Sequence, residues 1–271
     1  MSPLVRFFLL VGATWLAAWL PIGLWTGDFD YVLTPVSRGS GERQLYQGLF
    51  YTGLLLAFVD CWRRCAPSRP KWGRPILFAL YFVQGLVASL ILRGVLYGSG
   101  LASWAVADLT WWRTLEIAIS CLAVALVEEA IFRGFLLGTI VERLGWSKGV
   151  VLTSLLFAIV HLFRPGGLTF KLCYGLGLFG VGFLLSCIAW RHNSILASAG
   201  FHGGLIVLNL STQAVFFRPS LWSGYQLEPV SGLLSLLLTM AFYGLWTRLV
   251  PVSEPSVCAP GPDDASPLSE G

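Results

Sequence analysis

Two adjacent glutamates and an arginine stand within an apolar stretch of the chain, at Glu128, Glu129 and Arg133. On a helix, Glu129 and Arg133 lie one turn apart on the same face, where they can form an ion pair. Glu128 lies about 100° around the helix and has no partner at this spacing. Two neighbouring carboxylates in a low dielectric resist double ionisation, and a carboxyl tuned in this way suits a general base. The alternative is an ion pair that only fixes helix packing, with one glutamate idle.

Two of the three histidines also lie in apolar segments, at His161 and His202, and Asn209 follows His202 two helical turns later on the same face. From the predicted cytoplasmic helix ends, the helical rise places Glu128, His161 and Asn209 at similar depths of about 20–22 Å. His202 lies nearer that side, at about 12 Å. We therefore expect these side chains, from different helices, to line one cavity. The third histidine, His192, lies in a short polar connection and is predicted to be solvated.

A carboxylate, two imidazoles and an amide suit the activation of water for acyl transfer. Glu128 and His161 would hold and deprotonate a water that attacks a peptide carbonyl, while His202 and Asn209 would donate hydrogen bonds to the oxyanion. The sequence contains neither the G-x-S-x-G pattern of a serine nucleophile nor the zinc-binding H-E-x-x-H pattern. A zinc ion held by Glu128, His161 and His202 stays open on ligand type alone.

The composition shows what kind of molecule must position these groups. Of the 271 residues, 56% are apolar and 12% are charged, and the mean hydropathy is +0.73. Soluble domains carry about 25% charged residues, so this chain cannot cover a soluble surface. The composition excludes a cytosolic globule, a disordered chain and a nucleic-acid binder. The prediction is a polytopic integral membrane protein with the lipid bilayer as its surroundings.

Eight stretches approach the length of about 20 apolar residues that crosses a bilayer. Because backbone polar groups must be satisfied within lipid, each stretch is predicted to be a helix, which gives an all-α bundle of about eight transmembrane helices. The second stretch reaches full length only if residues 60–62 sit at the membrane interface. The predicted spans are 7–27, 45–59, 75–92, 117–141, 149–163, 172–190, 194–217 and 230–247.

Basic residues gather between the second and third spans, which predicts that this connection and both termini are cytoplasmic. The first span is interpreted as a retained helix and not as a secretory signal. Residues 1–250 are predicted to form one membrane domain, with the motifs in a core over 112–217, and 251–271 to form a disordered tail. Close helix packing, and not a phosphate loop, is predicted for four glycines of the sixth span: Gly175, Gly177, Gly180 and Gly182.

Over about 124–209 the order and spacing of the polar motifs resemble those of the CPBP family of intramembrane proteases. That family includes the type II CAAX prenyl endopeptidases and bacterial bacteriocin-processing or immunity proteins. The resemblance implies a glutamic-type peptidase of the membrane that needs no cofactor and acts on a peptide or protein substrate, in a bacterial inner membrane. The motifs that carry it are Glu128-Glu129-x-x-x-Arg133, Phe157-x-x-x-His161 and His202.

Roles for individual residues follow from this resemblance. The first acid of the pair, Glu128, would be catalytic, His161 would help to activate the water, and His202 would stabilise the oxyanion. The family often has Asn four residues after that last histidine, whereas this chain has Ile206. Asn209, a backbone group or a water would then complete the oxyanion site.

Three functions compete at this point. The leading prediction is an active intramembrane endopeptidase that cuts near the membrane surface. The second is a catalytically silent family member that acts as a membrane binding, immunity or assembly protein. A proton-coupled carrier is the third, because buried Glu and His also mark proton relays. The chain shows no pair of related halves, which argues against the carrier.

Overall fold

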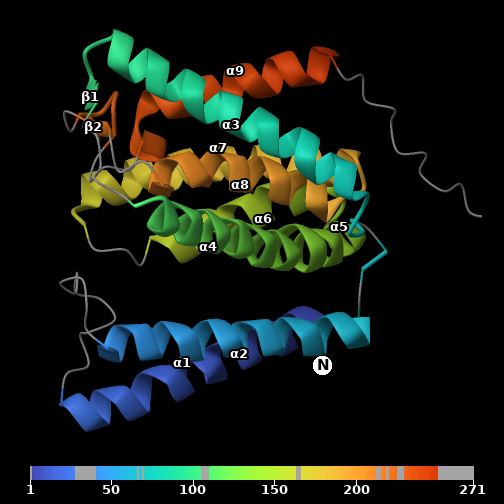
Figure 1. Ribbon diagram of the computed structural model, residues 1–271. Coiled ribbons are helices and arrows are strands. Elements are labelled where there is room, and N and C mark those ends of the chain that lie inside the picture. Colours follow the sequence, from blue (N-terminus) through green and yellow to red (C-terminus); the bar gives the residue numbers. More distant parts are fainter. Residues whose placement is uncertain are drawn as a thin grey trace, which may run out of the picture.

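The computed structural model describes residues 2–27, 41–65, 67–68, 70–104, 110–162, 166–211, 215–217, 220–224 and 229–249, and their regular structure is almost wholly helical (Figure 1). The α-helices are α1 (Pro3–Thr26), α2 (Gly41–Cys65), α3 (Pro75–Gly98), α4 (Trp111–Glu129), α5 (Gly138–Leu144), α6 (Trp146–His161), α7 (Leu168–Arg191), α8 (Ile195–Ser211) and α9 (Leu233–Leu249). A π-helix, η2 (Ala130–Leu137), joins α4 to α5, and a 3₁₀ turn, η3 (Pro229–Ser231), precedes α9. Two short strands are β1 (Ala102–Trp104) and β2 (Val215–Phe217).

The predicted all-α bundle is confirmed, and a helix covers each predicted span wholly or for most of its length. Within the described part of the chain, three helices are long and apolar enough to cross a membrane, namely α1, α3 and α7. The helices α6, α8 and α9 are apolar but shorter. The number of eight crossings stays a prediction. The predicted tail, 251–271, lies outside the described residues.

The seventh predicted span ends too late. Helix α8 stops at Ser211, and residues 215–217 form β2, which pairs antiparallel with β1 so that Ala102 faces Phe217 and Trp104 faces Val215. A run of one β-branched and two aromatic residues favours an extended strand. Pairing with β1 satisfies backbone groups that a continued helix would otherwise have bonded internally.

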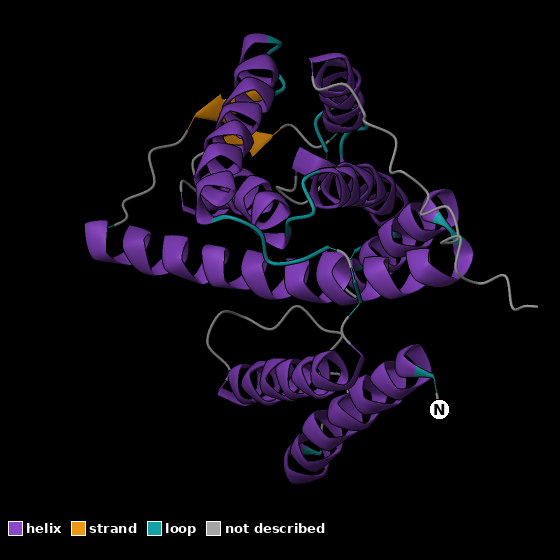
Figure 2. Ribbon diagram, turned by 90° about the vertical axis from the view of Figure 1, so that its right-hand side faces the viewer, coloured by secondary structure: helices purple, strands orange, loops and turns teal. Residues whose placement is uncertain are grey.

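Helices α4, η2 and α5 follow one another without a break and form one long rod (Figure 2). The π-helix begins directly after Glu129, and all eight of its residues are buried. A π-helical segment shifts the side chains that follow it relative to a regular α-helix, and such segments are frequent at functional sites. The glutamate pair therefore sits where the exposed part of the rod meets its buried part.

Glycines bring α3 and α8 into backbone contact. A Cβ added at Gly85 would overlap the carbonyl oxygen of Phe201, and one added at Gly204 would overlap that of Phe82. Small residues allow this close approach between membrane helices. Because His202 lies on α8 between these contacts, its helix is held tightly against α3.

The glycines of α7 confirm the predicted close packing. A Cβ at Gly182 would lie 3.2 Å from the Phe157 ring and 3.3 Å from Cα of Ser154, both on α6. At Gly177, an added Cβ would overlap the backbone of Val230 in η3. The sixth predicted span therefore packs against α6 and η3 at distances that larger side chains would prevent.

Helices α1 and α2 form a hairpin beside the bundle (Figure 1). The hairpin reaches the bundle near η2, where the rings of Phe7 and Phe135 lie 5.3 Å apart. Its own two helices are joined by Asp60, whose carboxylate accepts hydrogen bonds from Arg6 at 2.7 Å and from Arg64 at 2.9 Å. The interface position expected for residues 60–62 stays a prediction.

Candidate active site

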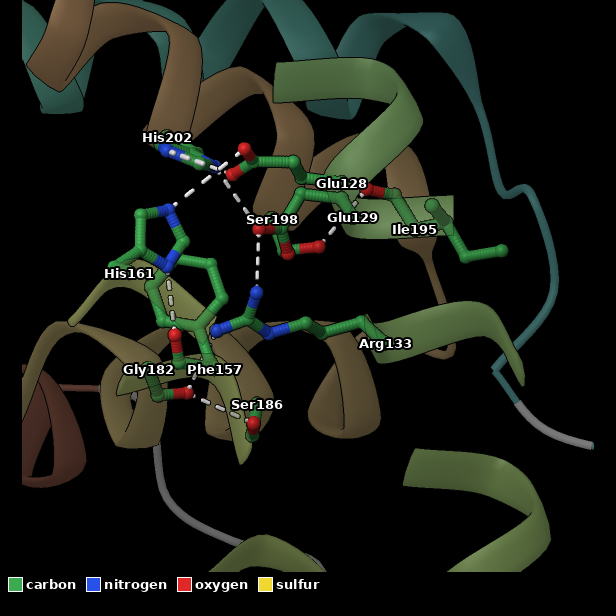
Figure 3. A network of polar contacts seen from close by, with 10 residues as sticks. All are labelled: Glu128, Glu129, Arg133, Phe157, His161, Gly182, Ser186, Ile195, Ser198 and His202. Carbon is green, nitrogen blue, oxygen red and sulfur yellow. Dashed lines mark hydrogen bonds and ion pairs between the residues drawn. The ribbon is translucent and has the colours of Figure 1, made fainter. Parts of the chain in front are cut away.

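Three side chains from three helices meet at one point (Figure 3). Glu128 comes from the last turn of α4, His161 from the end of α6 and His202 from the middle of α8. The Glu128 carboxylate lies 3.8 Å from Nε2 of His161 and 4.0 Å from Nε2 of His202. The side chains of Glu128 and His161 each keep 20% of their surface exposed, and that of His202 keeps 8%. The site is therefore enclosed but open on one side.

The backbone fixes the orientation of the His161 ring. Its Nδ1 lies 2.7 Å from the carbonyl oxygen of Phe157, which can only accept a hydrogen bond. Nδ1 therefore carries the proton, and in the neutral ring Nε2 presents its lone pair towards Glu128. The 3.8 Å between that nitrogen and the carboxylate is too long for a direct hydrogen bond, but it suits two groups that bond to the same water.

Glu129 faces the interior and is completely buried. Its Oε1 accepts a hydrogen bond from Nη1 of Arg133 at 2.7 Å and another from Nδ1 of His202 at 3.0 Å. The ion pair with Arg133 matches the spacing in the sequence. The contact with His202 was not expected, because that residue was predicted to line the cavity as a donor to the oxyanion.

The Arg133 guanidinium is also completely buried and has further partners. Its Nη2 donates to the carbonyl oxygen of Gly182 at 3.0 Å, which also accepts a hydrogen bond from Ser186 at 2.8 Å. Its central carbon lies 4.5 Å from the centre of the Phe157 ring, close enough for a cation–π contact. A buried charge needs such a set of partners, and removing one partner costs about 3–5 kcal/mol.

Phe157 forms the apolar wall between two polar layers. The open layer contains Glu128 and His161, and the closed layer contains Glu129 and Arg133. Its ring centre lies 4.7 Å from that of His161 and 6.0 Å from that of His202. The ring of Phe132 meets it edge-on at 5.1 Å. One phenylalanine therefore contacts both imidazoles and the guanidinium, and its carbonyl fixes the His161 tautomer.

The sequence pointed to some of this network and missed other parts. Glycines in the sixth predicted span signalled close packing, but not that the carbonyl of Gly182 would bind Arg133. Ser186, which lies one turn later, gave no signal among the many serines of apolar segments. Asn209 lies on α8, but its side chain is outside the part that the structure describes.

His192 is not solvated as predicted. It is half-buried between helix ends, where its Nε2 and the Tyr81 hydroxyl form a hydrogen bond of 2.6 Å. The indole N–H of Trp246 in turn donates to the Tyr81 oxygen at 3.2 Å. Burial, and then the nearby charge of Arg191, lower the pKa of His192 below its ordinary value of 6.5. This histidine joins α3 and α9 to the connection between α7 and α8.

The metal alternative has no further support in the geometry. Among the residues that the structure describes, no group of three His, Cys, Asp or Glu side chains has the arrangement of a metal site. The chemistry that the arrangement supports directly is proton transfer between a carboxylate, two imidazoles and a bound water.

Comparison with known protein families covers the same region. Residues 110–208 match the family model described as type II CAAX prenyl endopeptidase Rce1-like. Residues 110–208 are thus similar to this family. The match runs from the start of α4 into α8 and includes Glu128, His161 and His202 as well as the ion pair of Glu129 with Arg133, while Asn209 lies one residue beyond it. None of the curated proteins with which the sequence was compared matches it.

The Rce1-like match confirms the predicted resemblance to the CPBP proteases. The match is a similarity to a family of proteases, and the apolar helices indicate an integral membrane protein. A peptidase of the membrane that acts on a peptide or protein substrate is therefore supported at this coarse level.

Proposed function

We propose that the protein is an intramembrane endopeptidase in which Glu128 is the general base. The observation that carries the proposal is the position of its carboxylate, 3.8 Å and 4.0 Å from two imidazole nitrogens on other helices. The neighbouring Glu129 is buried and bonded to Arg133 and His202, whereas Glu128 borders the open side. Of the two carboxylates, Glu128 is thus the one that a water and a substrate can reach.

In the first step, a water is held between Glu128 and Nε2 of His161. Glu128 takes a proton from this water, and the water oxygen forms a bond to the carbonyl carbon of the peptide. The carbonyl oxygen becomes an oxyanion. Glu128 then returns the proton to the amide nitrogen as the carbon–nitrogen bond breaks, so no proton is lost or gained overall. A base in this role contributes about 10²- to 10⁴-fold to the rate.

His202 would stabilise the oxyanion through Nε2. Because its Nδ1 already donates to Glu129, an Nε2–H donor requires the imidazolium form of the ring. Glu129 provides a counter-charge for that form at 3.0 Å. Preorganised donors of this kind are worth about 3–4 kcal/mol in other enzymes. Asn209 is proposed as a second donor, in place of the family asparagine at the position of Ile206.

The proposal is tested with purified protein in nanodiscs. Because the matched family is that of CAAX prenyl endopeptidases, a farnesylated CAAX-type peptide and an unmodified membrane-anchored peptide serve as reporters. We expect the wild type to cut one of them and Glu128→Gln to cut neither. The matched control is Glu142→Gln. Glu142 is an exposed carboxylate on α5 that accepts a hydrogen bond from the backbone N–H of Ser68.

Turnover by purified Glu128→Gln protein would reject the assignment of the base. A wild type that binds but never cuts these peptides, and whose Glu128→Gln variant traps no precursor by mass spectrometry, would favour the silent family member. Turnover that persists after exhaustive chelation, with metal content checked, would discard zinc, whereas loss that zinc restores would replace the glutamic mechanism.

A further inference from the structure

The two oxygens of the buried Glu129 carboxylate have different surroundings. Oε1 accepts hydrogen bonds from Nη1 of Arg133 at 2.7 Å and from Nδ1 of His202 at 3.0 Å. Oε2 is also buried, but among the residues that the structure describes it has no hydrogen-bond partner. Both oxygens of a carboxylate are acceptors, and buried polar atoms are nearly always bonded. Oε2 of Glu129 is therefore an acceptor that needs a donor.

A serine hydroxyl, that of Ser198, lies beside this carboxylate (Figure 3). Ser198 is on α8, one turn before His202, and is completely buried. In the structure its Oγ donates to the carbonyl oxygen of Ile195 at 3.0 Å. A hydroxyl has a single proton and can rotate about its C–O bond. It can therefore donate either to this carbonyl or to Glu129, but not to both at once.

The carbonyl of Ile195 does not depend on that hydroxyl. It lies in the first turn of α8, where a carbonyl accepts the backbone N–H four residues later. The Glu129 carboxylate is charged, and hydrogen bonds to an ionised acceptor are about twice as strong as bonds between neutral groups. Turning the hydroxyl from the carbonyl to Oε2 therefore exchanges a second bond to a neutral acceptor for a charge-assisted one.

A donor on Oε2 affects the position of the proton on His202. In the proposed mechanism His202 is an imidazolium whose Nδ1–H bonds to Oε1 of Glu129. In a low-dielectric interior, this charged pair competes with the neutral pair that forms when the proton moves from Nδ1 to Oε1. A hydrogen bond to the charged form of a carboxylate favours that form. The donor thus keeps the proton, and with it the positive charge, on the imidazole.

We propose that Ser198 is a positioning residue that donates to Oε2 of Glu129 and thereby keeps His202 in the imidazolium form during turnover. This inference rests on the proposed function, because it acts through the residue that stabilises the oxyanion there. Ser198 itself does not touch the substrate. In the described part of the chain, the charged or titratable groups that face His202 come from α4, η2 and α6. These groups are Glu128, Glu129, Arg133 and His161.

The test compares substitutions at two buried serines. Ser198→Ala removes the hydroxyl, and Ser198→Cys replaces it with a thiol, which is a weaker donor. The matched control is Ser154→Ala on α6. Ser154 is also completely buried, and its Oγ donates to a carbonyl of its own helix, that of Val150, at 2.7 Å. All variants are assayed in nanodiscs of one lipid composition on the two reporter peptides.

We expect Ser198→Ala to lower kcat by about tenfold at an unchanged KM, because the lost hydrogen bond acts on the transition state and not on the bound substrate. Ser198→Cys should lie between Ser198→Ala and the wild type, and Ser154→Ala should equal the wild type. An unchanged kcat in Ser198→Ala, or an equal loss in Ser154→Ala, overturns the proposal. Melting temperatures are measured on the same preparations, and a kcat that falls only in proportion to the folded fraction also overturns it.

A spectroscopic measurement tests the proposal without turnover. The chain has three histidines, so isotope labelling of the histidine nitrogens gives three rings in the NMR spectrum, and the ring of His202 is assigned with His202→Gln. Without the donor on Oε2, Oε1 of Glu129 is the stronger base. In Ser198→Ala the Nδ1 resonance of His202 should therefore move towards that of a nitrogen without a proton, and in Ser154→Ala it should not move.

This measurement separates the inference from the proposed function. If the wild type cuts neither reporter, the proposed function fails, but a shifted Nδ1 resonance in Ser198→Ala alone still supports the bond between Ser198 and Glu129. An Nδ1 resonance that is the same in Ser198→Ala and in the wild type overturns the inference, whatever the turnover of the variant.

Discussion

The two glutamates have opposite surroundings, although they follow one another directly in the sequence. Glu129 faces a closed layer in which Arg133, His202 and the carbonyl of Gly182 complete a buried network. Glu128 faces an open layer, where its nearest imidazole nitrogens are 3.8 Å and 4.0 Å away. One helical step of about 100° is enough to separate a buried, ion-paired carboxylate from one on the open side.

This difference follows from the free-energy cost of a charged carboxylate in each environment. A buried carboxylate without partners is too expensive to keep charged, so the interior glutamate must be paired with a cation. A carboxylate that is to accept a proton must instead lack a fixed cation partner and must reach water. The two glutamates therefore lie next to one another on one helix, but in layers with opposite requirements.

The largest contrast is expected from Glu128→Gln. This substitution keeps the size of the side chain and removes the base, so turnover should fall by about 10²- to 10⁴-fold. Because Glu128 borders the open layer, the melting temperature should change little. Both are measured on the same preparation, and a large loss of thermal stability with turnover retained would reverse the roles of the two layers.

Arg133→Met should produce the opposite result. Removing the guanidinium leaves Glu129 buried without its ion-pair partner, which costs about 3–5 kcal/mol of folding free energy. Unfolding in mixed micelles measures this loss. The matched control is Arg143→Met at an exposed position of α5, where a change within about 0.5 kcal/mol is expected. Equal stability of the two variants would contradict the closed layer.

Gly182→Ala tests the closed layer without changing a charge. The added methyl would lie 3.2 Å from the Phe157 ring and 3.3 Å from Cα of Ser154, so α6 and α7 must separate slightly. Overpacking of this kind costs about 1–3 kcal/mol. Gly94→Ala on α3 is the control, since nothing lies within 4 Å of its added Cβ. A smaller loss for Gly182→Ala than for Gly94→Ala would show that the contact is not tight.

The smallest expected effect is a pH dependence of folding from His192, which lies outside both layers. Its pKa is lowered in the folded protein, by burial first and then by Arg191, so below pH 6.5 the unfolded chain binds more protons. Stability should be complete above that pH and decrease as the pH falls towards the lowered folded pKa. His192→Gln should reduce this slope in melting experiments, and an equal slope in both proteins would exclude His192 as its source. In this variant the pH profile of turnover is also free of the change in folding stability that His192 causes.

Much of the fold was predictable because lipid leaves the backbone few options. Apolar stretches of span length had to be helices, and the described helices follow them. The end of α8 was not predictable in this way, because residues 215–217 are as apolar as a span and their strand depends on a partner at 102–104. Nothing local to either segment shows that pairing.

The candidate site was predictable where a residue type was rare for its surroundings. Charged or imidazole groups in apolar stretches mark Glu128, His161 and His202, and i,i+4 spacing marks the ion pair of Glu129 with Arg133. The carbonyl of Gly182 gave no signal, since every residue has a carbonyl and only the path of α7 brings this one to the guanidinium. His192 was misjudged because its burial depends on Tyr81 and Trp246, which are far away in the sequence.

The glycine contacts between α3 and α8 have a mechanical consequence for catalysis. Where two backbones touch, neither helix can slide or roll without steric clash, because close-packed interiors do not deform continuously. The position of His202 on α8 is consequently held rigid, whereas Glu128 lies at the end of α4. In the proposed mechanism, adjustment during turnover then falls to the substrate and to the α4 side, and His202, proposed as the oxyanion donor, is the fixed group against which the scissile bond is aligned.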